Sequence, residues 1–326
     1  MSILEVNNLK VSFDTVMGKV EAVKGVDLTV NAGEVLGVVG ESGSGKSVTS
    51  LAIMGLINNS TGSIESGEIL FQGKNLLELK EKEMCKIRGN KVSMIFQEPM
   101  TSLNPVVTVY KQLREVYKIH RPDMKNKCRE ELITLLAQLN IPDSNAVLNK
   151  YPFELSGGLK QRIMIAMAMI CKPSVIIADE PTTALDVTTQ AEIIELLKKI
   201  KDESNSGIML ITHDLGVIAE MAQRVIVMYF GKVVEECSVK AFFDNARHPY
   251  SEDLLAAMPE NFDGRFQSIE GNVPNLYEEV KGCAYYSRCK KSIEECQKNE
   301  PPMVELYNGH KVRCFKCEAI EKGDNK

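Results

Sequence analysis

The feature that most constrains the fold is a glycine-rich loop at residues 40–47, which reads GESGSGKS and fits the pattern G-x4-G-K-S. A compact apolar run at residues 35–39 precedes it and predicts a strand that is buried on both faces. Residues 47–57 predict a helix after the loop. Glycine lets the backbone turn so tightly that its N–H groups point at phosphate oxygens. We therefore predict a strand–loop–helix unit that binds nucleotide phosphates.

Charged and hydroxyl side chains around this loop predict hydrolysis with magnesium. Lys46 supplies a point charge for the β and γ phosphates, and the Ser47 hydroxyl is placed to bind magnesium. Another apolar strand candidate, residues 175–178, ends in Asp179 and Glu180. Asp179 would hold magnesium directly or through water, and Glu180 would orient the attacking water or accept its proton.

A second helix start with phosphate-binding residues lies at Ser156, Gly157 and Gly158. One nucleotide does not need two such helix ends from a single chain. The arrangement is explained if these residues grip the γ-phosphate of an ATP that another subunit holds. The alternative is that Ser156 is an ordinary helix N-cap.

The order of predicted elements indicates the fold class. Residues 208–212 and 225–228 are further strand candidates, and residues 156–170 and 190–201 are helix candidates. Residues 106–150 are charged and helix-patterned, and residues 1–40 alternate as short strands. Strands that alternate with helices predict a parallel α/β sheet. After about residue 240 the composition shifts toward Pro, Asn and Cys.

Charge and hydropathy exclude several classes of protein. The formal net charge is −5, so the chain is a poor candidate for wrapping nucleic acid. No apolar run approaches the ~18 residues that a membrane span needs. The first residues lack the basic and apolar segments of a secretory signal, so we expect a cytosolic protein.

Together these motifs resemble the nucleotide-binding subunit of ABC transporters, over about residues 3–235. The loop at residues 40–47 corresponds to the Walker A motif. The resemblance implies that Gln97 senses magnesium and the attacking water, and that His213 contacts the γ-phosphate as a switch. It also implies that Asp186 belongs to the loop that crosses a dimer interface. The implied catalytic residues are Glu180, His213 and Gln97.

The resemblance also implies a set of ATP and magnesium contacts. ATP contacts are assigned to Phe13, Gly40, Ser42, Gly43, Ser44, Gly45, Lys46, Ser47, Val48, Gln97 and Asp179. Magnesium contacts are assigned to Ser47, Gln97 and Asp179. Phe13 is the candidate for stacking on adenine, and a core position on a strand is the alternative for its ring.

Within the family, the motifs resemble the ATPases of oligopeptide, dipeptide and nickel importers. The matching segments are residues 39–47, 96–105 and 178–188, followed by His248, Pro249 and Tyr250, then Leu254, Leu255 and Pro259. The implied fold is an α/β P-loop (RecA-like) core with an antiparallel β subdomain and a helical signature subdomain. The implied domains are residues 1–240 for the ATPase, with the helical part at about 98–165, and residues 241–326 for a Cys-rich extension.

The resemblance implies a transport function with defined partners. Two ATPase subunits sandwich two ATP molecules, and their closure drives two transmembrane permeases supplied by an extracytoplasmic substrate-binding protein. The second ATPase is a related chain or another copy of this one. The subunit is then held peripherally at the cytoplasmic face of the membrane. A nickel or metal-chelate importer is the alternative. A soluble ABC ATPase of DNA repair or translation is disfavoured, because the chain has no sustained heptads and one ATPase unit.

Five of the nine cysteines lie near the end of the chain. Four of them, Cys283, Cys289, Cys296 and Cys314, suit a 4Fe–4S cluster or a structural zinc, and Cys317 is supernumerary. Unligated or disulfide-bonded cysteines remain an alternative. The resemblance implies iron–sulfur, since the extension holds a 4Fe–4S cluster in some relatives. The tail lies far beyond the ATPase motifs, so we expect it to have no direct role in hydrolysis.

The remaining cysteines are scattered along the ATPase part of the chain. We predict that they are small buried apolar residues. They are Cys85, Cys128, Cys171 and Cys237.

Overall fold

The structure is a computed structural model that describes residues 2–57, 60–98, 102–124, 127–183, 185–258, 269–278, 280–307 and 309–317. The chain forms two compact units. The first comprises Val30–Glu34 and Glu78–Met209, and the second comprises Ser2–Thr29, Val35–Leu77 and Leu210–Lys326. The predicted domain boundaries at residues 98, 165 and 240 are a separate division and stay predictions.

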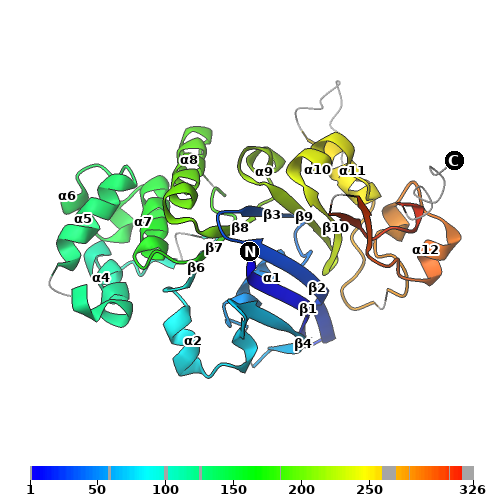
Figure 1. The fold of residues 1–326 in the computed structure, drawn as a ribbon, viewed down its shortest axis with the longest axis horizontal. Coiled ribbons are helices and arrows are strands. Elements are labelled where there is room, and N and C mark those ends of the chain that lie inside the picture. Colours follow the sequence, from blue (N-terminus) through cyan, green and yellow to red (C-terminus); the bar gives the residue numbers. More distant parts are fainter. Residues whose placement is uncertain are drawn as a thin grey trace. The chain divides into compact units, whose positions relative to one another are not determined.

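The first unit consists mainly of helices around two parallel strands (Figure 1). Its strands are β6 (Val92–Ile95) and β7 (Val175–Asp179), which pair with Val92 opposite Val175. Its helices are α2 (Glu81–Ile87), α4 (Val109–His120), α5 (Cys128–Gln138), α6 (Ser144–Asn149), α7 (Gly157–Met169) and α8 (Val187–Ser204), with 3-10 turns η2 (Pro122–Met124) and η3 (Pro152–Glu154). Helices α4, α5 and α6 bury Leu113, Leu132 and Leu148, which confirms the helical pattern of residues 106–150.

The second unit contains two groups of strands. One antiparallel sheet has the order β2-β1-β4-β5, and the other strands follow the order β11-β12-β10-β9-β3. The strands are β1 (Ser2–Thr15), β2 (Gly18–Asn31), β3 (Val35–Val39), β4 (Gly62–Phe71), β5 (Lys74–Asn75), β9 (Arg224–Tyr229), β10 (Lys232–Ser238), β11 (Val304–Tyr307) and β12 (His310–Val312). The helices are α1 (Lys46–Ile53), α9 (Leu215–Met221), α10 (Val239–Asn245), α11 (Pro249–Ala256) and α12 (Glu294–Lys298), with η1 (Leu76–Glu78) and η5 (Tyr286–Arg288).

Most of the predicted elements form, and their lengths differ at two places. The predicted strands at residues 35–39, 175–178 and 225–228 are β3, β7 and β9, and the strand predicted at residues 208–212 is β8 (Gly207–Ile211), which ends one residue earlier. Before β3, residues 2–31 form two strands of 14 residues each, where several short strands were predicted. Gly25, a predicted break between strands, lies inside β2 with φ 83°. It interrupts the alternation of apolar and polar side chains along the strand but does not end the strand. Helix α1 ends at Ile53, earlier than predicted, and Gly55 follows with φ 62°.

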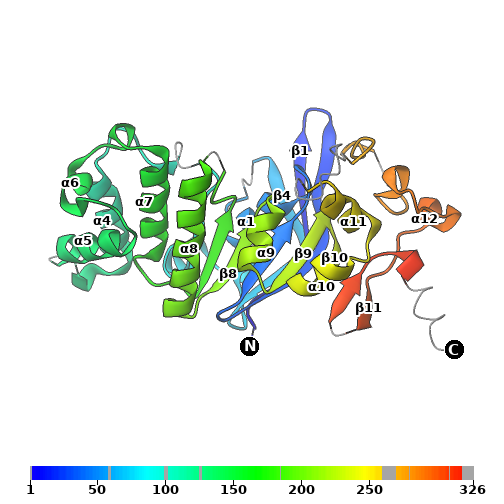
Figure 2. The ribbon, with the colours of Figure 1, turned by 90° about the horizontal axis from the view of Figure 1, so that it is seen from above.

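The C-terminal segment adds a hairpin that the sequence did not predict. Strand β12 pairs antiparallel with β10, with Val312 opposite Glu235, and β11 pairs with β12 (Figure 2). Glu235 is fully buried, and its carboxylate accepts hydrogen bonds from the backbone N–H groups of Arg247 and His248. The ring of His310, on β12, lies 2.7 Å from the same carboxylate. The segment is thus joined to β10 both by backbone pairing and by a buried polar group.

The scattered cysteines are only partly buried as predicted. Cys128 and Cys237 are buried and Cys171 is half-buried, whereas the prediction is wrong for Cys85, which is exposed. Cys85 lies on the outer face of the short helix α2, where its thiol donates to Glu81 at 3.3 Å. In the part of the chain that the structure describes, each helix is too short or too polar to cross a bilayer.

Candidate nucleotide-binding site and cysteine pocket

The predicted phosphate loop lies in the second unit, between the end of β3 and the start of α1. Gly40 and Gly45 have φ values of 148° and 99°. A Cβ atom on Gly40 would lie 2.1 Å from the Met228 carbonyl oxygen, and one on Gly45 would lie 2.7 Å from the Ala22 carbonyl oxygen. The loop therefore needs glycine for both its backbone conformation and its close packing.

Lys46 lies inside the curve of this loop. Its ammonium donates to the carbonyl oxygens of Gly40 and Glu41 at 2.8 and 2.9 Å, and to the Ser44 hydroxyl at 3.3 Å. The residue is only 7% exposed, so the loop holds a buried positive charge. Gly40, Ser44 and Gly45 are buried as well, whereas Ser42 and Gly43 are exposed and Ser47 and Val48 are half-buried.

Phe13 and His213 also belong to the second unit. The half-buried Phe13 lies on β1 opposite Gly62, where a Cβ atom would lie 2.7 Å from the Phe13 ring. That packing matches the core alternative, and adenine stacking stays a prediction. His213 is exposed and follows β8, next to Asp214, which caps α9 by accepting from the Gly216 N–H at 2.9 Å.

The first unit holds the predicted catalytic carboxylate. Asp179 is buried as the last residue of β7, and Glu180 follows with φ 47°. The side-chain amide of Gln97 donates to Glu180 Oε2 at 2.9 Å, and the Thr183 hydroxyl donates to the same oxygen at 2.8 Å. A left-handed backbone at a non-glycine residue is uncommon and is retained where surrounding contacts determine it. The structure therefore brings Gln97 and Glu180 together, as the resemblance implied.

Ser156 is the N-cap of α7, and its hydroxyl accepts from the Leu159 N–H at 3.4 Å. Asp186 caps α8 by accepting from the Thr189 N–H at 2.9 Å and the Thr189 hydroxyl at 2.8 Å. These bonds lower the pKa of Asp186. A Cβ atom on Gly158 would lie 2.8 Å from the Thr189 methyl, so the two caps are close neighbours. Gly157 starts α7 beside them and is exposed.

Two contacts of this region were missed by sequence reasoning. The Gln161 side-chain amide, on α7, donates to the Pro181 carbonyl at 2.6 Å, just after Glu180. Thr183 is the other, through the bond to Glu180 described above. Gln161 contacts a residue of another element and Thr183 contacts a residue across a turn, so no local sequence pattern predicts these two hydrogen bonds.

The four predicted cluster ligands line one pocket of the C-terminal segment, which we call the cysteine pocket. Cys283 is brought to Cys296 by a backbone hydrogen bond, in which its N–H donates to the Cys296 carbonyl at 2.8 Å. A Cβ atom on Gly282 would lie 2.2 Å from that carbonyl, so only glycine permits the approach. Cys289 and Cys314 complete the set, and their residues are half-buried.

The thiols of the cysteine pocket differ in acidity. Burial raises the pKa of Cys283 to about 11 and also raises the pKa of Cys289. The pKa of Cys314 is lowered to about 6, chiefly by a hydrogen bond from the Cys317 thiol and then by backbone N–H groups. Cys317 also donates to the Arg247 carbonyl at 3.2 Å, so it lies beside the pocket as a supporting donor.

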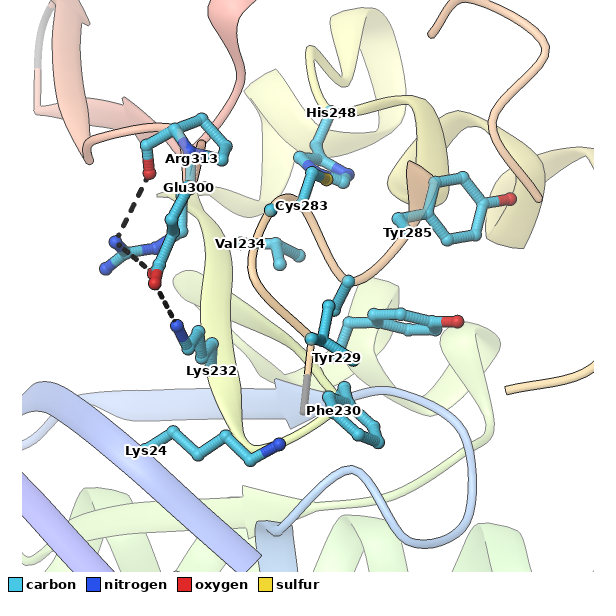
Figure 3. A pocket seen from close by; sticks show the side chains of 14 residues that line it. Lys24, Tyr229, Phe230, Lys232, Val234, His248, Cys283, Tyr285, Glu300 and Arg313 are labelled. Atoms are coloured by element: carbon cyan, nitrogen blue, oxygen red, sulfur yellow. Dashed lines mark hydrogen bonds and ion pairs between the residues drawn. The ribbon is translucent and has the colours of Figure 1, made fainter. Parts of the chain in front are cut away.

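A second pocket borders the cysteine pocket, because Cys283 and Tyr285 line both (Figure 3). On one wall the ammonium of Lys24 lies 3.4 Å from the centre of the Phe230 ring. Burial lowers the pKa of Lys24 to about 8. On another wall Glu300 forms ion pairs with Lys232 of β10 and with Arg313. This wall links the C-terminal segment to β10.

Comparison with known proteins places the chain in a family. Residues 23–183 match the family model described as ABC transporter, and residues 234–296 match the C-terminal region of oligopeptide/dipeptide transporters. The oligopeptide transport ATP-binding protein AppD of Bacillus subtilis is 47% identical over 97% of both chains. The dipeptide transport ATP-binding protein DppD of Escherichia coli is 46% identical over 96% of both chains.

A solved structure extends the comparison to the fold. A dimeric ATP-binding cassette, in a post-hydrolysis state bound to ADP and Pi, has a TM-score of 0.65 and 29% identity. The match covers 72% of this chain and 98% of that one, which confirms the predicted P-loop ATPase core. The identity to the relatives extends over nearly the whole chain, including the cysteine-rich segment. The chain therefore belongs to the ABC transporter family, as an ATP-binding subunit of the oligopeptide/dipeptide importers.

Proposed function

We propose that the chain binds Mg-ATP on the loop at residues 40–47 and hydrolyses it to power peptide import. The observation that carries this is the burial of the Lys46 ammonium within a loop that only glycine can form. Lys46 would meet the β and γ phosphates, and Ser47 and Asp179 would hold magnesium together with Gln97. His213 would contact the γ-phosphate.

Glu180 is the proposed group that activates water. Its carboxylate oxygen Oε2 accepts hydrogen bonds from Gln97 and Thr183, which fix its direction at the end of β7. A carboxylate held in this way can orient a water molecule and accept its proton. Gln97 would also respond to bound magnesium, since it is hydrogen-bonded to that same carboxylate.

A dimer is proposed as the working form. Ser156, Gly157 and Gly158 would bind the γ-phosphate on the partner, with Asp186 at the interface. The contact of Gly158 with Thr189, which is bonded to Asp186, supports one shared surface. The partner ATPase would be a related chain or a second copy, joined to two permeases at the cytoplasmic face of the membrane and served by a substrate-binding protein. The names of the relatives favour peptides over nickel or other metal chelates.

The ATP site is tested by comparing two variants. Glu180→Gln keeps the side-chain size but removes the proton acceptor, so we expect normal Mg-ATP affinity and turnover reduced by about a hundredfold or more. Lys46→Ala should weaken ATP binding itself, because it removes the charge inside the loop. Hydrolysis by Glu180→Gln at near the parent rate would reject its role, and unchanged affinity in Lys46→Ala would reject the loop.

We also propose that the cysteine pocket holds a 4Fe–4S cluster through Cys283, Cys289, Cys296 and Cys314. Four cysteine side chains around one pocket provide a complete thiolate set for such a cluster. A structural zinc bound by the same four thiolates is the alternative. When bound, the cluster would cross-link this small segment and stabilise its fold.

Metal analysis of anaerobically purified protein tests this assignment. We expect about four irons and four sulfides per chain and a brown colour. The matched control is Cys85→Ser, whose exposed thiol lies outside the pocket and should leave the iron content unchanged. Stoichiometric zinc without iron would reject the cluster, and it would leave the ATP-site proposal untouched.

A further inference from the structure

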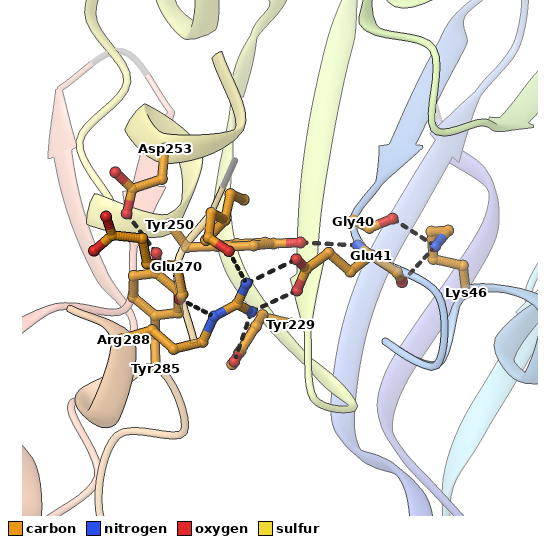
Figure 4. Close-up of polar contacts among 10 residues, drawn as sticks. Gly40, Glu41, Lys46, Tyr229, Tyr250, Asp253, Glu270, Tyr285 and Arg288 are labelled. Carbon is orange, nitrogen blue, oxygen red and sulfur yellow. Dashed lines mark hydrogen bonds and ion pairs between the residues drawn. The ribbon is translucent and has the colours of Figure 1, made fainter. Parts of the chain in front are cut away.

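We propose that the C-terminal segment positions the phosphate loop, with Arg288 and Tyr250 as positioning residues that hold Glu41 and so raise the affinity for ATP. Glu41 is the first residue after Gly40 in the loop, and Arg288 belongs to η5 (Figure 4). The two residues are 247 positions apart in the sequence, and their contact is a direct link between the extension and the nucleotide loop.

The Arg288–Glu41 contact is a partly buried two-point ion pair. Nη1 donates to one carboxylate oxygen at 2.7 Å, and Nη2 donates to the other at 3.0 Å. The Arg288 side chain is 3% exposed and the Glu41 side chain is 28% exposed. Two parallel charge-assisted bonds fix both the distance and the direction of a carboxylate. Ion pairs between exposed side chains on the surface generally contribute little to stability, because water and salt screen them and the side chains are free to move.

The Arg288 guanidinium also forms hydrogen bonds with residues of the C-terminal segment and of β9. It donates to the carbonyl oxygens of Glu270 at 3.0 Å and Ile269 at 3.3 Å, and to the Tyr229 hydroxyl at 3.3 Å. The rings of Tyr229 and Tyr285 lie 5.9 and 5.7 Å from its central carbon. Arg288 therefore presents a fixed pair of donors to the loop.

Tyr250 holds the same loop residue through the backbone. Its hydroxyl accepts a hydrogen bond from the Glu41 N–H at 2.8 Å, and the residue is fully buried. The Glu41 carbonyl accepts from the Lys46 ammonium at 2.9 Å. Glu41 is thus bonded at its N–H, its carbonyl and its carboxylate, and the carbonyl contact reaches the lysine that serves the phosphates.

These contacts favour ATP binding in two ways. A carboxylate inside a phosphate-binding loop repels phosphate, and Arg288 both neutralises it and holds it toward the C-terminal segment. A loop that is already ordered also loses less conformational entropy when the ligand binds. The proposal concerns this loop alone and needs no metal in the cysteine pocket, so it can fail independently of the cluster.

The test measures Mg-ATP affinity and steady-state kinetics of the full-length chain. We expect Arg288→Gln to raise Kd and KM for ATP about fivefold, with kcat changed less than about twofold. Arg288→Lys should recover part of the affinity, because it restores the charge without the two-point geometry. The matched control is Lys311→Gln, which breaks the 3.3 Å contact of Lys311 with Glu236 on β10 and should leave Kd unchanged.

Two further variants separate positioning from general unfolding. Tyr250→Phe removes only the acceptor for the Glu41 N–H, and we expect Kd to rise about threefold. In a Glu41→Gln background, Arg288→Gln should change Kd by less than about twofold, because the charge it neutralises is gone. Unchanged Kd in both Arg288→Gln and Tyr250→Phe would overturn the proposal. So would an equal loss in Lys311→Gln, or an Arg288→Gln effect of the same size in both backgrounds.

Discussion

His248 shows how burial fixes the protonation state of one side chain. The residue is 2% exposed, and its ring Nδ1 accepts the Tyr250 N–H at 3.1 Å as the cap of α11. Burial lowers its pKa to about 4, from 6.5. The folded chain therefore prefers the neutral imidazole, whose unprotonated nitrogen can accept this bond. The nearby Glu235 carboxylate opposes the shift but does not overcome the burial.

This predicts a loss of stability in mild acid. Because the folded pKa is depressed, the contribution of neutral His248 is complete above about pH 6.5 and is lost as the pH falls toward 4. We expect the free energy of unfolding to decrease by about 2 kcal/mol between pH 7 and pH 5. Thermal unfolding at both pH values measures this decrease. His248→Asn is the control, because asparagine can also cap the helix but does not titrate. An equal decrease of Tm in His248→Asn would contradict the assignment.

Helix α7 is the element on which the dimer hypothesis depends. Its first turn carries Ser156 and Gly158, and the Ser156 hydroxyl is engaged in capping its own helix. We expect Ser156→Arg to lower ATPase activity by about tenfold or more, because bulk and charge would prevent closure onto the partner. ATP affinity of the isolated subunit should stay near the parent value. A fall in that affinity as large as in Lys46→Ala would mean that Ser156 serves its own chain's nucleotide.

Elements were predictable where local chemistry decides them. The phosphate loop and the buried strands β3 and β7 follow from glycine spacing and apolar runs within a few residues. The strand pair β11 and β12 was missed because the strands have only four and three residues and their pairing partner β10 lies far away in the sequence. Cys85 was predicted as buried from residue type alone, yet helix α2 turns it outward.

The candidate site was predictable to the same extent. Glu180 was predicted from the acidic end of a buried strand and Gln97 was implied by the family resemblance, and the structure shows the two hydrogen-bonded. The link from Arg288 to Glu41 joins two residues that are ordinary in their local sequence, so only the fold reveals it. The expectation that the tail has no direct role in hydrolysis stays a prediction, and the structure adds a contact between the tail and the phosphate loop.

At the scale of the whole molecule, Arg288 adjoins Cys289, so the cysteine pocket and the phosphate loop share one short segment. We expect Cys289→Ser to make residues after about 275 more sensitive to limited proteolysis, since one proposed ligand is lost. Basal kcat should survive, since we expect the tail to have no direct role in hydrolysis. A tail as resistant to protease as the parent would contradict a folding role for the cluster.

The pairing of β12 with β10 has a consequence for aggregation. Without the C-terminal segment, one side of β10 would present unpaired N–H and C=O groups, which template association with other chains. The same truncation would remove His310 from the buried Glu235. We expect a chain that ends at Met258 to form oligomers and precipitate, as measured by light scattering. The extension covers an edge of β10, so we expect the cassette of this chain to be monodisperse only when it is expressed together with the extension.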